Sequence, residues 1–176
     1  VPPVDSEPRG IPFNDSTAFM LTKDGVAAPA VFIFVTENGT ISGWNPTLDM
    51  GSAIDVGPAI SAQSSYKGAA TVKTLFGPLL FVTNFKDGVV HVFDQSFAHT
   101  MSFTDPALPP DYVPFGIAAM GGNVVVTSAL ADADREDDVP GAGHGYIDVF
   151  RPDGTLVKRL VSRGALNSPW GLAVAP

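Results

Sequence analysis

The sequence predicts an all-β fold: a β-propeller segment of about three four-stranded blades, roughly half of a six-bladed ring. Three observations support this prediction. A strand–turn–strand pattern occurs three times, a glycine between bulky and apolar residues precedes each occurrence, and no window shows the 3.6-residue periodicity of a helix. A repeat of ~40–50 residues that contains several strands is typical of propellers.

The composition fits this fold class and excludes several others. The 176 residues include 18 Gly and 16 Pro, 45% are hydrophobic and only 16% are charged, as in proteins made of strands and tight turns. A net charge of −8 disfavours nucleic acid as a partner, and no apolar run is long enough to span a membrane. Because the chain has no cysteine, disulfides, thiolate metal sites and thiol nucleophiles are excluded.

The first strand of each blade is predicted at a repeated glycine. Glycine has no side chain and lets another backbone approach closely, as expected at the packed inner strand of a blade. The four occurrences, roughly 50 residues apart, are Pro8-Arg9-Gly10-Ile11, Tyr66-Lys67-Gly68-Ala69, Pro114-Phe115-Gly116-Ile117 and Pro169-Trp170-Gly171-Leu172.

The second and third strands follow as pairs at 31–36 and 40–44, 79–83 and 89–94, and 123–127 and 146–150. Asn38-Gly39 and Asp87-Gly88 are hairpin-turn signals, because both residue types accept positive φ at low cost. The fourth strands are predicted at 52–56, 99–103 and 155–161. The blades therefore occupy 8–65, 66–113 and 114–168, and 169–176 is the first strand of the next blade.

Three blades cannot close a ring, since propellers usually have four to eight. The chain also lacks an initiating Met, and we interpret it as a fragment, a mature or internal piece of a longer chain. Its terminal blade faces are expected to be covered by the remaining propeller blades, by a second copy, or by a companion chain.

Five phrases of the sequence carry a resemblance to known proteins: 34–46, Tyr66-Lys67-Gly68, 102–109, 137–143 and 166–173. They resemble a family of exported, largely uncharacterised propellers that relate loosely to NHL-repeat propellers; some bacterial members end in a PEP-CTERM sorting tail. The likeness extends over nearly the whole chain. It implies a six-bladed fold, an extracellular or otherwise exported protein and a full length about twice this one, and it implies no catalytic residues.

An acidic insertion interrupts the third repeat and suggests the cofactor Ca²⁺. Clustered carboxylates on a loop can supply its oxygen ligands. The EF-hand pattern fails, because with Asp132 first the sixth position is Asp137 instead of Gly and the twelfth is Gly143 instead of Glu. The alternative is a solvated acidic loop. The candidate ligands are Asp132, Asp134, Glu136, Asp137 and Asp138.

A second metal hypothesis concerns the residue after each Val-Thr pair, which is Glu37, Asn84 or Ser128. Equivalent positions of successive blades reach the same end of a ring, so Glu37 and Asn84 could converge on the channel mouth. By fold-level analogy, gluconolactonase-type propellers hold a divalent cation there. The alternative is that these are ordinary turn residues.

Histidine and serine carry no diagnostic motif. His91, His99 and His144 are too widely spaced for a zinc set, and His91 is expected to point off the core face of its strand. No G-x-S-x-G elbow occurs, and nothing in the sequence argues for a Ser-His-Asp triad.

Two surface roles remain open. Asn14-Asp15-Ser16 and Asn38-Gly39-Thr40 are acceptor triplets for N-glycosylation at Asn14 and Asn38. Aromatic residues could stack on sugars, although packing in the core is the favoured interpretation. The residues concerned are Trp44, Tyr66, Tyr112, Phe115 and Trp170.

The function predicted from the sequence is an extracellular scaffold or binding module, whose channel or loop face holds a small ligand, carbohydrate, ion or protein. The alternative is a metal-assisted hydrolase of the gluconolactonase type. An enzyme is not the favoured prediction, and no catalytic residue is assigned.

Overall fold

The computed structural model describes residues 7–57, 60–61 and 63–173. In these residues the chain forms three four-stranded antiparallel sheets and one two-stranded hairpin, and no helix. No helix in the described part is long and apolar enough to cross a membrane. The all-β prediction and the partial propeller are confirmed.

Each four-stranded sheet runs from an inner strand to an outer strand in chain order. The first contains β1 (Pro8–Gly10), β4 (Phe32–Thr36), β5 (Ile41–Trp44) and β6 (Ile54–Gly57). The second contains β7 (Tyr66–Thr74), β8 (Gly77–Asn84), β9 (Val89–Phe93) and β10 (His99–Phe103). The third contains β11 (Tyr112–Met120), β12 (Asn123–Leu130), β13 (Tyr146–Phe150) and β14 (Leu156–Ser162). The hairpin of β2 (Met20–Lys23) and β3 (Val26–Pro29) is an insertion in the first repeat that the sequence analysis missed.

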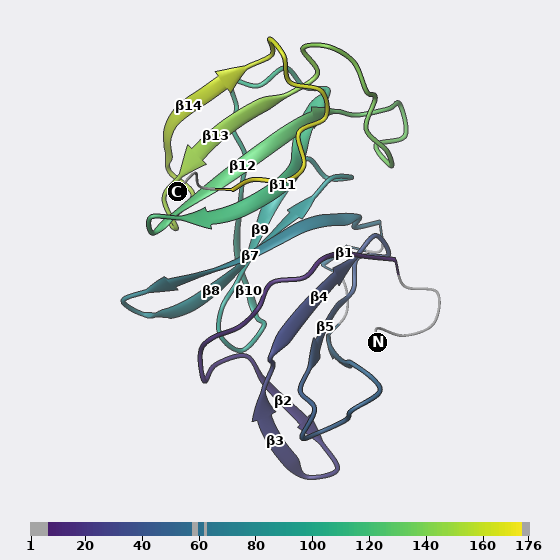
Figure 1. Cartoon of the computed structure of the whole chain (residues 1–176), viewed down its shortest axis with the longest axis vertical. Helices are drawn as coiled ribbons and strands as arrows, with labels where there is room; N and C mark the ends of the chain where they lie inside the picture. The colour runs from purple at the N-terminus through teal and green to yellow at the C-terminus, as the bar shows by residue number, and fades with distance from the viewer. Residues whose placement is uncertain (1–6, 58–59, 62, 174–176) are drawn as a thin grey trace.

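The inner strands lie side by side: β7 contacts β1 on one flank and β11 on the other (Figure 1). The repeated glycines permit this approach. A Cβ atom added to Gly10 would lie 2.6 Å from the Ala69 backbone nitrogen, and one added to Gly68 would lie 3.0 Å from the Phe115 carbonyl oxygen. A Cβ on Gly116 would overlap the Trp170 carbonyl oxygen. The glycine repeat therefore marks the contacts between successive inner segments.

A threonine hydroxyl joins neighbouring blades at two of these contacts. The Thr83 hydroxyl accepts a hydrogen bond from the Gly68 N–H (2.7 Å) and donates one to the Phe115 carbonyl (2.7 Å). In the next blade the Thr127 hydroxyl accepts from the Gly116 N–H (2.8 Å) and donates to the Pro169 carbonyl (2.5 Å).

The segment after the third sheet therefore starts where the inner strand of a following blade would start. It is not, however, assigned as a strand: 169–173 belong to no sheet, and the rest of the predicted strand, 174–176, lies outside the described residues. In the first blade Thr36 pairs instead with the hydroxyl of Thr40, at 2.8 Å.

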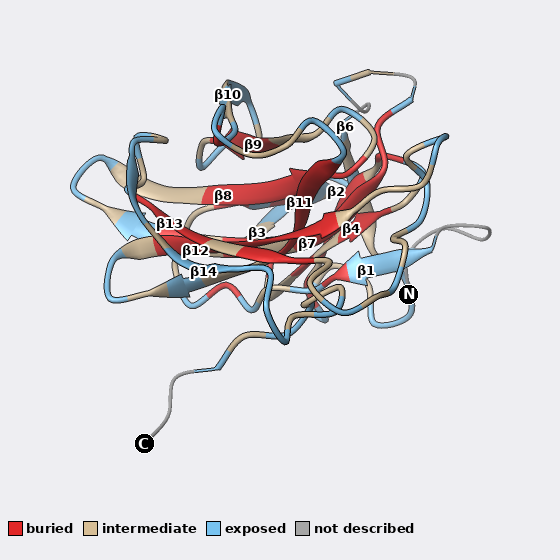
Figure 2. Cartoon of the chain, turned by 90° about the horizontal axis from the view of Figure 1, so that it is seen from above, coloured by how far each residue is buried: buried red, intermediate tan, exposed pale blue. Residues whose placement is uncertain are grey.

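The two larger of three apolar clusters in the described residues lie between the sheets. Figure 2 shows the buried residues gathered in the inner and middle strands, whereas β14 is largely exposed. The cluster between the first and second sheets includes Ile33, Val35, Ile41, Tyr66, Leu80, Val82 and Phe93. The cluster between the second and third includes Val72, Phe81, Val90, Val92, Val124, Val126 and Phe150.

A buried group of three charged side chains lies at the outer part of the interface between the second and third blades. Arg159 on β14 binds Asp148 (Nε–Oδ1 2.9 Å) and Asp105, whose side chains are 2% and 1% exposed. Burial raises the pKa of Asp148, and the charge and hydrogen bond of Arg159 oppose this shift only in part. One guanidinium thus compensates two buried carboxylates and anchors the connection between the blades.

Candidate functional site at the end of the inner strands

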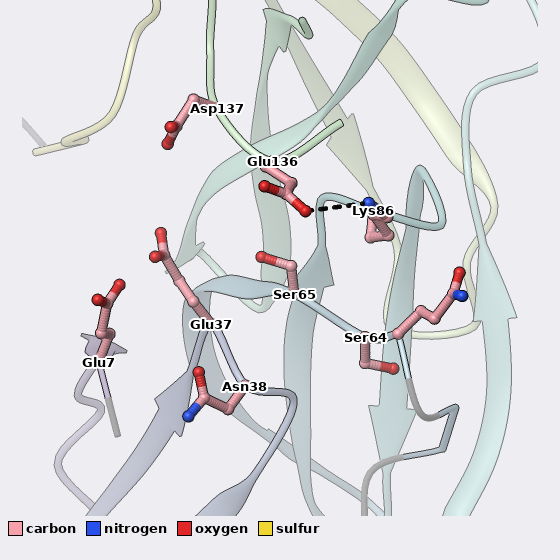
Figure 3. Close-up of a pocket in the computed structure, with 9 residues that line it drawn as sticks. Glu7, Glu37, Asn38, Ser64, Ser65, Lys86, Glu136 and Asp137 are labelled. Atoms are coloured by element: carbon pink, nitrogen blue, oxygen red, sulfur yellow. Dashed lines mark hydrogen bonds and ion pairs between the residues drawn. The ribbon is translucent and has the colours of Figure 1, made fainter. Parts of the chain in front are cut away.

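A cavity of about 640 Å³ opens where the first, second and third blades meet (Figure 3). The start of β1, the β4–β5 turn, the segment before β7, the β8–β9 turn and the acidic insertion all contribute to it. Its lining includes four carboxylates and one ammonium group. The lining residues are Glu7, Glu37, Asn38, Gln63, Ser64, Ser65, Lys86, Glu136 and Asp137.

A second cavity of about 200 Å³ adjoins the first and shares Glu37 and Asp137 with it. Arg9, Lys67, Phe115 and Trp170 line it, and each is the residue immediately before a repeated glycine. The repeat thus brings four side chains from distant parts of the sequence to one place, two of them cationic and two aromatic. Asp138 completes the lining.

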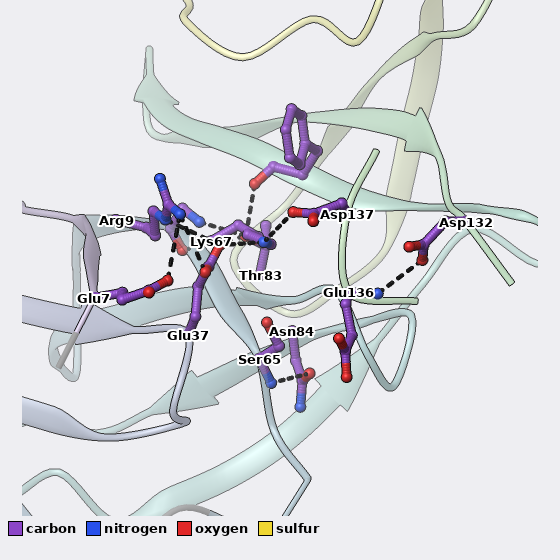
Figure 4. Close-up of polar contacts among 12 residues, drawn as sticks. Glu7, Arg9, Glu37, Ser65, Lys67, Thr83, Asn84, Asp132, Glu136 and Asp137 are labelled. Atoms are coloured by element: carbon purple, nitrogen blue, oxygen red, sulfur yellow. Dashed lines mark hydrogen bonds and ion pairs between the residues drawn. The ribbon is translucent and has the colours of Figure 1, made fainter. Parts of the chain in front are cut away.

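Lys67 is the buried centre of the polar contacts in this site (Figure 4). Its side chain is only 4% exposed, and its ammonium group binds Glu37 and lies 3.8 Å from Asp137. The ammonium also stands 5.4 Å from the centroid of the Phe85 ring, within the range of a cation–π interaction. Arg9 adds a second cation, with Nε 2.9 Å from Glu37.

The surroundings of Glu37 and Glu7 shift the pKa values of the two carboxyls in opposite directions. Burial by itself would raise the pKa of Glu37, but hydrogen bonds with Glu7, Lys67 and Arg9 and the charge of Lys67 outweigh burial and lower the pKa to about 2. Glu7 is affected in the opposite direction, because its hydrogen bond with Glu37 and the Glu37 charge raise its pKa. Glu37 is therefore an anion at neutral pH and holds the two cations.

The remaining acids of the cavity are more exposed. The Asp137 side chain is 81% exposed and the Glu136 side chain 69% exposed. Lys86 contacts Glu136 at 3.4 Å and also donates to the Asp134 carbonyl at 2.6 Å. The mouth of the cavity consequently presents carboxylates that the protein's own cations neutralise only in part.

The aromatic residues are mostly packed, as predicted. Phe115 and Trp170 meet edge to face with ring centroids 4.5 Å apart. Tyr66, Tyr112 and Phe115 are buried, and Trp44 is half-buried. Trp170 is 41% exposed and is thus the aromatic that keeps a free surface at the smaller cavity.

The acidic insertion does not gather its five carboxylates at one point. Asp132 accepts the Glu136 N–H at 2.9 Å, Glu136 faces Lys86, and Asp137 faces Lys67. Among the described residues, no three His, Asp or Glu side chains form a group that could hold a metal ion. The Ca²⁺ hypothesis for Asp132, Asp134, Glu136, Asp137 and Asp138 therefore has no preformed ligand set in this fold.

Glu37 and Asn84 are also directed to different partners. Glu37 faces the cavity and binds Lys67 and Arg9, whereas Asn84 is fully buried within the second blade. The Asn84 side chain contacts Ser64, Asp87 and His91 and accepts the N–H of Ser65. These contacts leave it no free group for the predicted shared cation.

The two sequons differ in their surroundings. Asn14 is 6% exposed and its amide nitrogen, the atom that would carry a glycan, donates to the carbonyls of Ala18 (3.1 Å) and Ala30 (2.8 Å). Glycosylation at Asn14 stays a prediction, and it would require this nitrogen to leave its buried position. Asn38 is exposed, and glycosylation there stays a prediction.

The interpretation of His91 also needs correction. It was expected to point off the core face, but it is 5% exposed. Both faces of a middle blade pack against neighbours, so alternation along its strands does not separate buried from exposed positions. His144 has a structural position: its Nδ1 lies 2.8 Å from the Val139 carbonyl, and its ring covers Gly141.

Comparison with known proteins supports the fold and leaves the function open. No known family matches the sequence. The chain is 30% identical over 180 residues to "Uncharacterized protein R648" and 31% identical over 183 residues to "Uncharacterized protein L690", both of Acanthamoeba polyphaga mimivirus. Each alignment covers 97% of this chain but only 44% and 47% of those proteins, so the chain spans less than half of their length.

Among solved structures, virginiamycin B lyase from Staphylococcus aureus superposes with a TM-score of 0.58 at 15% identity. The match covers 91% of this chain and 43% of the lyase. At this level of identity the likeness concerns the fold, which is propeller-like. Together with the three sheets described above, it identifies the chain as part of a β-propeller.

Proposed function

We propose that the chain is the ligand-binding part of a propeller, and that its larger cavity binds a positively charged peptide segment. The observation that supports this most directly is the lining of the 640 Å³ cavity, to which residues of three blades contribute four carboxylates and one ammonium group. An acidic cleft raises the local concentration of cationic ligands and steers their approach. The net charge of −8 acts in the same direction.

The arrangement suits a lysine or arginine side chain. Glu37 already forms ion pairs with Lys67 and Arg9. The side chains of Asp137 and Glu136 are exposed, and the nearby lysines neutralise their negative charge only in part. The exposed surface of Trp170 beside Asp137 and Asp138 adds an aromatic wall to the smaller cavity. A carboxylate next to an aromatic face is a favourable environment for an organic cation.

The hydrolase of the gluconolactonase type gains no support from the described residues. Its predicted ligand pair is divided, because Asn84 is buried in its own blade and Glu37 is held by two cations. Binding therefore remains the favoured function. Carbohydrate as a ligand and an extracellular location stay predictions.

Completion of the ring is part of the proposal. Blades from a longer polypeptide would cover the face of the third sheet. Two observations support this choice over a second copy or a companion chain. The curated relatives are more than twice as long as the aligned part, and Pro169 already occupies the place of Phe115 in the threonine contact.

Calorimetry with acetylated pentalysine, and with pentaglutamate as the anionic control, tests the binding proposal. We expect pentalysine alone to bind, with an affinity that falls as salt is raised from 50 to 200 mM. The double variant Glu136→Gln/Asp137→Asn should bind at least about tenfold more weakly. Asp24→Asn, which removes an exposed acid at the β2–β3 turn, is the matched control. Equal losses in both variants, or no binding of pentalysine to the unmodified chain, would refute the proposal.

A further inference from the structure

A second group of reactive side chains lies on the outer strands of the second blade, away from the cavity described above. Ser102 on β10 is exposed, and its hydroxyl oxygen lies 2.7 Å from Nδ1 of His91 and 2.9 Å from Nε2 of His99. His91 and Ser102 are paired across β9 and β10, so their side chains share one face of the sheet. Two imidazoles therefore converge on one accessible hydroxyl.

The hydrogen bonds of Asn84 determine which nitrogen of His91 carries the proton. The Asn84 carbonyl oxygen accepts the N–H groups of Ser65 (3.2 Å) and Asp87 (3.3 Å), and this fixes the orientation of the amide. The amide nitrogen consequently faces Nε2 of His91 at 3.0 Å. The same nitrogen has two hydrogens and also faces Ser64 Oγ (3.1 Å) and the Asp87 carboxylate (2.7 Å). Because it only donates, a hydrogen on Nε2 would point at another donor, and the ring proton is therefore assigned to Nδ1.

His91 remains neutral under ordinary conditions. Burial lowers its pKa to about 4, with a further decrease from the neighbouring His99 and a small opposing effect of Asp87. A neutral ring with its proton on Nδ1 donates that proton to the Ser102 oxygen. The hydroxyl of Ser102 is then free to donate its own hydrogen to Nε2 of His99. The hydrogen bonds are thus donated in one direction, from Asn84 to His91, from His91 to Ser102 and from Ser102 to His99.

We propose that Ser102 is an activated nucleophile that takes an acyl group from an ester, with His99 as its general base. A hydroxyl within hydrogen-bond reach of an imidazole base is the pair on which serine nucleophiles depend, and here the His91 N–H orients the hydroxyl toward that base. The His91 N–H would stabilise negative charge that develops on the Ser102 oxygen. This site is separate from the peptide-binding cavity and does not depend on the function proposed for it.

The reaction is an acyl transfer. The Ser102 oxygen forms a bond to the carbonyl carbon of the ester while its proton moves to Nε2 of His99. The bond between that carbon and the alcohol oxygen then breaks, and the departing alkoxide takes the proton from His99. The products are an O-acyl serine and an alcohol, and water can later release the acyl group as the acid.

Incubation with p-nitrophenyl acetate, followed by peptide mass spectrometry, tests the proposal. We expect acetylation of Ser102, with release of p-nitrophenol. Ser96 is the internal control: it is exposed and near in sequence, but its hydroxyl donates to the Asp94 carboxylate (2.6 Å) instead of meeting an imidazole. Acetylation of Ser96 at the same rate as Ser102, or of neither, would overturn the inference.

The variant His99→Gln tests whether His99 acts as the base for Ser102. His99→Gln changes an exposed side chain, so folding should persist, as circular dichroism can verify. The rate of Ser102 acetylation should fall by roughly tenfold or more, in line with the usual contribution of a general base. An unchanged rate in a folded His99→Gln protein would show that Ser102 is not activated by His99 and would contradict the mechanism.

Discussion

The hydrogen bonds and ion pairs of Glu37 with Glu7, Lys67 and Arg9 make the stability of the chain depend on pH in a defined direction. The pKa of Glu37 is lowered from its ordinary value of 4.5 to about 2 in the folded chain. A lowered pKa means that stability is fully present above the unfolded value and is lost as pH falls toward the folded value. The loss should therefore occur between about pH 4.5 and pH 2.

The magnitude follows from the size of the shift. Each pKa unit corresponds to about 1.4 kcal/mol, so the full shift would be worth about 3 kcal/mol at neutral pH. Glu37 keeps a 17% exposed side chain and Arg9 is 46% exposed, and solvent screening lowers the expected contribution to roughly 1–2 kcal/mol. Glu37→Gln should cost this amount at pH 7 and remove the Glu37 part of the pH dependence, whereas the part that comes from Asp49, whose pKa is also lowered to about 2, should remain.

Urea denaturation at pH 7, 5 and 3 measures both effects. The unmodified chain should lose stability mainly between pH 5 and pH 3, and the difference from Glu37→Gln should shrink over that interval. Lys67→Met/Glu37→Gln is the matched double variant, because it removes the buried cation together with its partner and should recover part of the loss. The reasoning is refuted if Glu37→Gln has the same stability as the unmodified chain at pH 7, or if it keeps the full pH dependence.

Three further predictions concern the contacts between blades, and thermal and urea unfolding test each of them. Gly116→Ala should destabilise the chain by about 1–3 kcal/mol, because the added Cβ would overlap the backbone of the next inner segment, whereas Gly171→Ala meets no atom within 4 Å and should be nearly neutral. Equal effects of the two would argue against the close backbone approach. Thr83→Val should cost about 1–3 kcal/mol by leaving a buried N–H and a carbonyl without their partner, and an unchanged midpoint would count against the hydroxyl bridge. Arg159→Met should cost about 3–5 kcal/mol because two buried carboxylates lose their cation, and Asp148→Asn in addition should restore part of it; a neutral Arg159→Met would contradict this account.

Much of the blade pattern was predictable because strands and turns depend on local residue types. The pairs that flank Asn38-Gly39 and Asp87-Gly88 are observed as β4–β5 and β8–β9. Gly39 and Gly88 have positive φ values of 73° and 70°, which glycine adopts without strain. The β2–β3 hairpin, with its turn at Asp24-Gly25, was missed because the prediction followed the strand–turn–strand repeat, and this hairpin is an insertion outside that repeat.

The candidate site was predictable only in part. Glu136 and Asp137 were identified from the acidic insertion and Glu37 from its position after a Val-Thr pair, but all three as metal ligands and not as the lining of cavities beside Lys67 and Arg9. The signal that could have found the two cations was present, since both precede a repeated glycine. The role of Arg9 and Lys67 could not be predicted, because a sequence repeat shows which positions are equivalent but not which side chains lie opposite them.

The order of strands, the glycine spacing and the excess of acidic residues can be read from the chain alone, because steric freedom and charge belong to individual residues and their neighbours. The packing of the blades decided the rest. It brought Glu37 and Asp137 to Lys67, since side chains that are distant in sequence meet only when the sheets stack, and the register of β9 and β10 within one sheet placed Ser102 beside His91. Charge and periodicity are local properties, whereas a site is a relation among distant residues that only the folded chain establishes.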